Sequence, residues 1–218
     1  MPEKPPSRLT MSGMIWRANN VLDRALDPKT RGVPRDLFEN CKGVILLSSI
    51  EAGFTFTGKL GTGIFMAKRR DGSWSVPCAI GLTAVGWGFA IGGSMKESMI
   101  FIMDQETLEA LAVNNSLKIG AQAEISIIKW GRSYNGGINC STKGVGGTVS
   151  IAFTKGLFGG LTLEGAVMGN RRAENEKFYD TTASVLQIII DEEITMPQGT
   201  KIDEVYRKLD LLKNGASA

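Results

Sequence analysis

Residues 51–79 read EAGFTFTGKLGTGIFMAKRRDGSWSVPCA, a run of short apolar segments separated by glycines. In Phe54–Thr57, aromatic and hydroxyl side chains alternate, which places both aromatics on one face of a strand. The pair Asp71-Gly72 tolerates the positive φ of a tight hairpin turn. The stretch therefore predicts an antiparallel meander with the basic run Lys68–Arg70 on its outer hairpin and with strands at Phe54–Lys59, Ile64–Lys68 and Ser73–Val76.

Further strands are predicted on both sides of this stretch. Val44–Ile50 is a nearly continuous apolar run and is expected to be buried on both faces. Period-two alternation predicts half-exposed strands at 119–127, 148–153 and 157–167, and Met99–Met103 adds another. The glycine-rich run 79–93 favours a buried segment that approaches its neighbours closely. Its glycine spacing does not fit a dinucleotide-binding loop.

Helices are predicted at both ends of the chain and between strands. Apolar residues recur at helical spacing in 7–26, and Pro34 begins a short helix that ends before Gly43. Four more helices are predicted. Asp104 caps one that ends at 112, Asn170 caps one that ends at 179, and Thr181 or Thr182 caps one that ends at 190. The last helix begins with a capping-box-like pair, Thr200 and Asp203.

The predicted fold is one α+β domain. We expect a glycine-rich, mainly antiparallel, strongly twisted or barrel-like sheet packed with N-terminal and C-terminal helices. A chain of 218 residues with 43% hydrophobic content can bury one such core. We expect a flexible leader at 1–6, the domain at 7–213 and a frayed tail at 214–218.

Composition removes several function classes. The sequence has no histidine, which excludes Ser-His and Cys-His nucleophilic sites and the commonest zinc ligand. A net charge of +3 is too small for a globally basic nucleic-acid binder. The three cysteines are widely spaced, which favours free thiols in a reducing compartment. No apolar signal or membrane-spanning run appears. We expect no metal and no cofactor.

Two blocks of sequence resemble the SYLF domain, the lipid- and actin-binding module of yeast actin-patch proteins and their animal relatives. The first block holds Ala52–Phe54, Phe56–Lys59, Gly61–Gly63 and Asp71–Ser75. The second holds Lys155–Gly160, Leu163–Gly165, Arg171-Arg172, Asn175 and Phe178-Tyr179. In one departure from the family pattern, Glu97-Ser98 stands where relatives usually carry Thr-Asp.

The resemblance implies a non-enzymatic module, cytoplasmic and peripherally membrane-associated. Its expected partners are phosphoinositide-containing membranes and filamentous actin, in endocytosis or membrane remodelling. Relatives often carry a Src-homology 3 or a FYVE domain beside it, and these 218 residues contain neither, so recruitment of proline-rich factors is not implied. No residue is singled out for actin.

Basic residues are the candidate lipid-binding groups, because arginine forks and lysine ammoniums bind phosphate monoesters. If these residues converge on one surface, their combined charge would suffice to recruit the protein reversibly to an anionic membrane. The alternative is that they are ordinary solvated charges scattered over the surface. Arg171-Arg172 stands at a predicted helix start, where a bound anion or a carboxylate partner would offset the unfavourable dipole. The candidates are Lys59, Lys68, Arg69, Arg70, Lys155, Arg171 and Arg172.

The first helix has two interpretations. It either docks on the core through its apolar stripe or lies on a membrane surface. In the second case Trp16 would be an interfacial aromatic, and Arg8, Arg17 and Arg24 would face anionic headgroups.

Two other functions stay open. A carrier would enclose an apolar, lipid-like ligand within the sheet. An enzyme would need a carboxylate pair such as Glu124 and Glu164, each on the polar face of a predicted strand. Exposed strand glutamates are far commoner than catalytic ones, so no catalytic residue is assigned.

Overall fold

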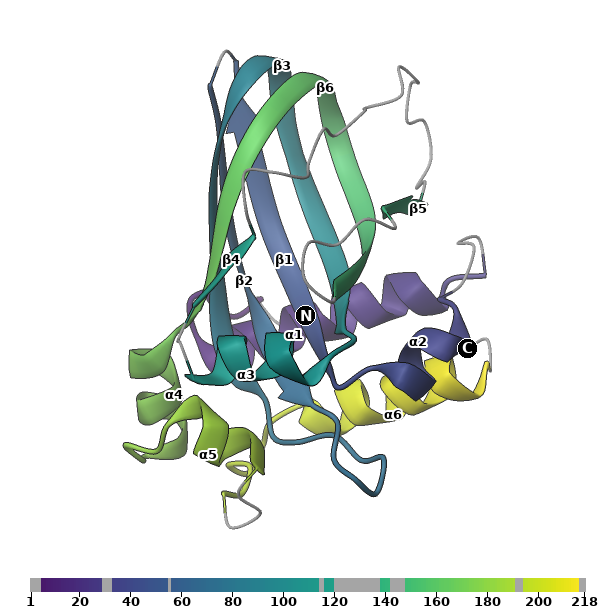
Figure 1. Cartoon of the computed structure of the whole chain (residues 1–218), viewed down its shortest axis with the longest axis vertical. Helices are drawn as coiled ribbons and strands as arrows, with labels where there is room; N and C mark the ends of the chain where they lie inside the picture. The colour runs from purple at the N-terminus through teal and green to yellow at the C-terminus, as the bar shows by residue number, and fades with distance from the viewer. Residues whose placement is uncertain are drawn as a thin grey trace.

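The fold is seen in a computed structural model of the chain (Figure 1). It describes residues 5–28, 33–54, 56–113, 116–119, 138–141, 148–190 and 194–215. For 57, 87–91, 116–119, 138–141, 152, 154–165 and 190, the backbone path alone is described.

Six helices and six strands are defined in the described residues. In chain order they are α1 (Met11–Leu26), α2 (Arg35–Asn40), β1 (Gly43–Gly53), β2 (Phe56–Ala67), β3 (Cys78–Ile102), α3 (Gln105–Val113), β4 (Ser116–Ile119), β5 (Ile138–Ser141), β6 (Thr148–Asn170), α4 (Arg172–Tyr179), α5 (Val185–Ile190) and α6 (Ile202–Asn214).

Two very long strands wrap around a central hairpin to form one twisted, unclosed antiparallel sheet. The strand pair β1–β2 is the hairpin. The first half of β3 pairs with β2 and its second half pairs with β1, so β3 arches over the hairpin's tip. Strand β6 pairs with β3 along its length and forms a second, outer arch (Figure 1). Gly92 lies at the bend of β3 with φ at 137°, a value that favours glycine.

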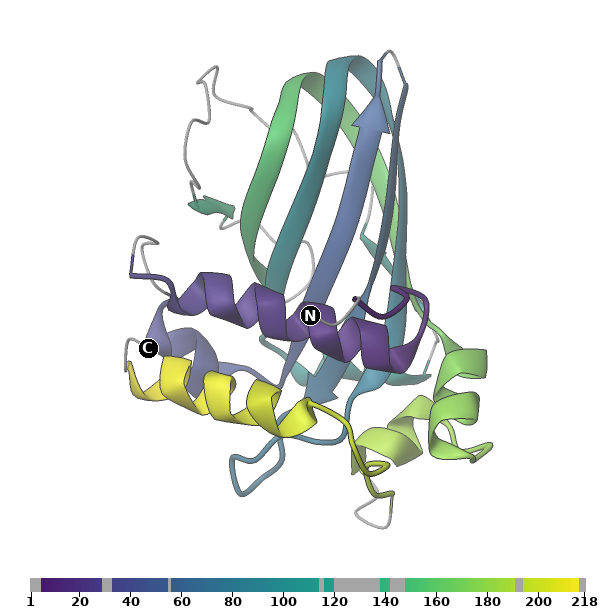
Figure 2. The ribbon, with the colours of Figure 1, turned by 180° about the vertical axis from the view of Figure 1, so that it is seen from behind.

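Helices cover both faces of the lower half of this sheet, the half that includes the start of β1. We call the face that α1 covers the outer face and the opposite face the inner face. Val44, Leu46, Ile64 and Met99 pack on the outer face with α1 and α6, and Ile45, Phe65 and Ile100 pack on the inner face with α3 and α5. No helix of the described residues covers the outer face of the upper half, which rises above α1 (Figure 2). The predicted α+β class is thus confirmed.

The glycines of the opening stretch do not divide its strands. Strand β2 is continuous through Gly58, Gly61 and Gly63, and the separate strands predicted within it were wrong. An ideal Cβ on Gly63 would lie 2.1 Å from the backbone oxygen of Leu46, so glycine lets β1 and β2 approach. The predicted strand at 73–76 is reduced to one bridge between Lys68 and Trp74. The strands predicted at 148–153 and 157–167 are both parts of β6.

Helix caps differ from several predictions. Asp104 does cap α3, since its Oδ1 accepts the N–H of Thr107 at 2.7 Å. Asn170 ends β6 instead of capping α4, and Arg171 holds the N-cap position. Ser184, not a threonine, caps α5 by accepting the N–H of Gln187. Helix α6 starts after Lys201 without a side-chain cap, so the predicted capping box was wrong.

Some predictions concern residues outside the described part. Most of the strand predicted at 119–127 lies there, with Glu124, and so do the ends of the chain at 1–4 and 216–218. For Glu164 and Cys140 only the backbone is described. Cys41 and Cys78 are free and buried.

Candidate functional site

Four arginines gather along α1 on the outer face of the sheet, and we call them the arginine row: Arg8, Arg17, Arg24 and Arg171. Arg17 and Arg24 lie two turns apart on α1, which puts them on one side of the helix. Arg171 reaches from the start of α4 to donate from Nη1 to the carbonyl oxygen of Leu9 at 2.6 Å. The structure therefore brings Arg171 together with the three arginines predicted for the first helix.

Carboxylates neutralise part of this charge. Glu97, on the outer face of β3, forms an ion pair with Arg24. Glu174 accepts the backbone N–H of Met11 at 2.6 Å and so caps the start of α1. Four arginines against these two carboxylates leave a surplus of positive charge along the helix.

Arg17 is half-buried and lies close to like charge. Burial and the neighbouring Arg8 lower its pKa from the ordinary 12.5, and Glu97 opposes that shift. Its Nε is buried and has no hydrogen-bond partner among the described residues. Its guanidinium carbon lies 5.5 Å from the centre of the Trp16 ring. A guanidinium in this situation is suited to accept an anionic ligand.

The hairpin turn at residues 68–74 lies at the opposite end of β2 from the tip of the β1–β2 hairpin, and the fold uses its three cations to different extents. Lys68 Nζ donates to the backbone oxygens of Phe38 at 2.6 Å and Glu39 at 2.9 Å, and so neutralises the end of α2. Arg69 is half-buried and acts electrostatically on Tyr206. Arg70 is exposed. Asp71 fixes the turn by accepting the hydroxyl of Ser73 at 2.7 Å and its N–H at 2.9 Å, and this bonding lowers the pKa of Asp71.

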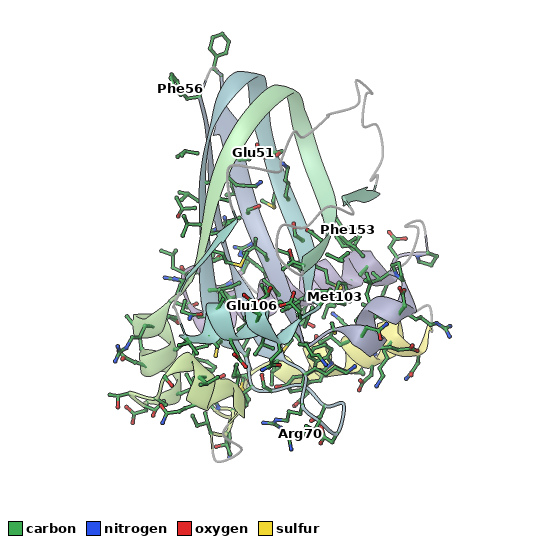
Figure 3. All side chains as sticks on the ribbon, in the orientation of Figure 1. Glu51, Phe56, Arg70, Met103, Glu106 and Phe153 are labelled. Atoms are coloured by element: carbon green, nitrogen blue, oxygen red, sulfur yellow. The ribbon has the colours of Figure 1, made fainter. Side chains whose placement is uncertain are left out.

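The other predicted cations do not converge with the hairpin. Lys59 and Lys68 lie near opposite ends of β2, roughly 30 Å apart at the rise of a strand. Figure 3 shows Phe56 and Arg70 at opposite ends of the molecule. Lys155 takes the register position beside Met95 in the upper half. Arg172 forms an ion pair with Glu176 at 2.7 Å, the carboxylate partner that its position called for.

Helix α1 is docked on the sheet. Its apolar stripe is buried against the outer face and α6, and Lys208 of α6 pairs with Asp23 at 2.6 Å. This apolar face is therefore not available to lipid while the helix is docked. Trp16 is half-buried and lines a pocket of about 220 Å³ together with residues 199–201. Of the helices that the structure describes, none has both the length and the apolar character of a membrane span.

A family model matches residues 83–211, more than half of the chain, and is described as "Ysc84: Las17-binding protein actin regulator". The chain belongs to the Ysc84 (SYLF) family. The resemblance read from the two sequence blocks is thereby confirmed. The family's description as actin regulators agrees with an actin-related role.

Curated relatives match this chain over part of their own, longer chains. An SH3 domain-containing protein of Schizosaccharomyces pombe is 31% identical over 89% of this chain and 46% of its own length. LAS seventeen-binding protein 3 of Saccharomyces cerevisiae is 28% identical over 82% of this chain and 38% of its own length. Human SH3 domain-containing YSC84-like protein 1 is 30% identical over 82% of this chain and 51% of its own length. The chain spans about half the length of these relatives, or less. No solved structure shows significant similarity to it.

The described residues give little support to the two alternative functions, a carrier of an apolar ligand and a carboxylate-based enzyme. The second pocket, about 270 Å³, lies between α3 and α5 and is smaller than the usual range for drug-sized ligands. The inner face of the upper sheet presents Ser49, Glu51 and Ser94, which are polar and buried, where a carrier of apolar ligands would present apolar side chains. The proposed carboxylate pair, Glu124 and Glu164, lies outside the described side chains.

Proposed function

We propose that this Ysc84 domain is a non-enzymatic module that binds anionic, phosphoinositide-containing membranes from the cytoplasmic side. The observation that supports this is the arginine row, where four guanidinium groups lie on one face with two carboxylates to neutralise them. Each cation near an anionic bilayer adds about 1 kcal/mol of attraction. Phosphate monoesters in particular match the guanidinium fork of arginine.

The hairpin is the competing headgroup site. Arg69 and Arg70 are on a turn fixed by Asp71, and Lys213 of α6 comes close to Gly72 in the same turn. The hairpin also carries its own carboxylate, and Lys68 is engaged with α2. The arginine row holds four guanidinium groups and the hairpin two, so we assign the first contact to the row.

Vesicle co-sedimentation of matched variants separates the two sites. The double variant Arg8→Gln with Arg17→Gln removes two charges from the row, and Arg69→Gln with Arg70→Gln removes the same charge from the hairpin. We expect wild-type binding to require phosphoinositides and to weaken at high salt. The row variant should bind about thirtyfold more weakly, at about 1 kcal/mol per lost charge, and the hairpin variant close to normally. Loss in the hairpin variant alone would move the headgroup site there, and absence of wild-type binding would end the proposal.

We further propose that the domain links membranes to the actin machinery, including filamentous actin, during endocytosis. The support is the family description, since no described residue specifies actin. Co-sedimentation of the chain with actin filaments, with and without vesicles, tests this half separately. A chain that reaches the pellet with vesicles and never with filaments would limit the function to lipid binding.

A further inference from the structure

The upper half of the outer face is apolar and exposed. Strand pairing places Ile50 beside Leu60 and Met95, and Val85 beside Gly58. Paired residues share a face of a sheet, and Phe56 joins them by alternation along β2. Leu60 is 64% exposed, Val85 70% and Phe56 71%. We call this set of five side chains the apolar patch: Ile50, Phe56, Leu60, Val85 and Met95.

Polar residues fill the opposite, inner face of the same strands. Glu51 follows Ile50 along β1 and is 1% exposed, and Lys96 Nζ lies 2.6 Å from its carboxylate. Ser49 and Ser94 are buried on that face as well. In β1, β2 and β3 the upper half thus places its charged residues inside and mainly hydrocarbon outside, the reverse of a water-facing sheet surface. Lys155 of β6 holds the register position beside Met95 at the border of the patch.

The backbone beneath the patch suits a low-dielectric environment. Strand β1 is hydrogen-bonded to β2 on one side and to β3 on the other, and β2 lies between β1 and the first half of β3. Strand β3 is itself covered by β6. The strands that carry the patch therefore present no open edge, and open edges are what hydrocarbon excludes.

The patch adjoins the arginine row. Successive positions up the outer face run from Leu46 and Ile64 beneath α1, through Ser48, Thr62 and Glu97, to Ile50, Leu60 and Met95. Glu97 marks the level of the arginines because it pairs with Arg24. An apolar surface bordered by cations is the profile of groups that bind at a bilayer interface. Figure 2 shows the upper parts of the strands directly above α1.

From these observations we infer that the upper outer face of the sheet inserts into the boundary between headgroups and acyl chains of an anionic bilayer. The inference rests on the proposed membrane function and names the surface that enters the lipid. A second copy of the chain would fit less well, because stacking two outer faces would oppose two arginine rows. Insertion leaves those arginines at the level of the lipid phosphates.

Tryptophan scanning with acyl-brominated vesicles tests the inference directly. Leu60→Trp places a fluorophore in the patch, and Val113→Trp places a matched one on an exposed apolar position at the end of α3. Against the wild-type tryptophan signal, we expect added quenching in Leu60→Trp and none in Val113→Trp. Vesicle binding without added quenching in Leu60→Trp would overturn the inference and leave the proposed function standing. If wild type does not bind vesicles at all, both the insertion of the patch and the proposed membrane-binding function are contradicted.

A second variant guards against effects of the introduced ring. Leu60→Ser with Val85→Ser removes apolar surface from positions that are already exposed, so the fold should be kept. Because a smaller apolar surface gains less free energy on transfer from water into the bilayer, we expect vesicle affinity to fall about tenfold, with the salt dependence unchanged. Unchanged affinity would contradict insertion. Sedimentation velocity without lipid measures the oligomeric state of both proteins. A dimer in wild type that is absent from the serine variant would overturn the inference and assign the patch to self-association.

Discussion

Arg24 forms an ion pair with Glu97, and this pair joins α1 to β3 at the border between the covered and the exposed parts of the outer face. Glu97 belongs to the Glu97-Ser98 pair, for which the family resemblance predicts Thr-Asp. Glu97 supplies the carboxylate that balances one arginine of the row.

Glu97→Gln should change stability and vesicle binding in opposite directions. The loss of the buried partner of Arg24 should lower the free energy of unfolding by about 1–2 kcal/mol. The same change raises the positive surplus by one charge, and affinity for anionic vesicles should rise about fivefold at low salt. Denaturant unfolding and vesicle titration measure the two effects. Weaker vesicle binding by the folded variant would contradict the assigned role of the row.

Lys68→Ala and Arg70→Ala should separate structural from exposed cations within one hairpin. Lys68 donates two charge-assisted hydrogen bonds to the end of α2, so its loss should cost about 1–2 kcal/mol of unfolding free energy. Arg70 is exposed, and its loss should cost less than about 0.5 kcal/mol. Thermal and denaturant unfolding of the two variants would give equal stabilities if Lys68 were a solvated surface charge.

Gly63→Ala should be far more damaging than Gly58→Ala in the same strand. A Cβ at Gly63 would collide with backbone of β1, whereas one at Gly58 meets nothing within 4 Å. We expect Gly63→Ala to cost about 3 kcal/mol or more, and Gly58→Ala to change stability little. Circular dichroism melts of the two proteins provide the comparison, and similar melting temperatures would show that β1 and β2 are not this close.

Stability should decline in alkali. Burial raises the pKa of the Cys78 thiol above its ordinary value of 9.0, and burial also raises the pKa of Tyr206, to about 12. As the pH rises past the ordinary pKa values, the unfolded chain releases protons that the native state still holds. The free energy of unfolding is therefore unaffected by these groups below pH 9 and falls as the pH rises above it. Each contributes a loss of about 1.4 kcal/mol per pH unit above its unfolded pKa. Melting temperatures followed from neutral pH into alkali should show the decline, and Cys78→Ala should make it shallower. An equal slope in that variant would count against the buried thiol.

The sequence predicted the elements better than their connections. Alternation in 148–153 and 157–167 correctly indicated strands, but glycines between such runs were read as interruptions. Strand β6 continues through Gly156, between the two predicted strands, because β3 supplies a partner along its full length. Glycine is unfavourable in an isolated strand, and the pairing that offsets this is set by residues far away in the chain.

The arginine row was predicted only in part. Helical spacing indicated Arg17 and Arg24 together, whereas the arrival of Arg171 depends on how α4 meets the start of α1. The expectation that Val44–Ile50 is buried on both faces was wrong at its end, because Ile50 is 43% exposed on the outer face. The apolar run did not show that the polar side chains beyond it face inward, because the burial of Glu51 depends on Lys96 from another strand.

One vesicle-partitioning cycle tests the central claim, that charge and apolar surface on a single outer face act together at the membrane. It compares wild type, Arg8→Gln with Arg17→Gln, Leu60→Ser with Val85→Ser, and the combination of all four changes, each at low and high salt. We expect the arginine changes to weaken binding about thirtyfold and to reduce its salt dependence, and the serine changes to weaken it about tenfold with the salt dependence unchanged. The combined protein should bind about three-hundredfold more weakly than wild type. Wild-type affinity in the combined protein would contradict the claim.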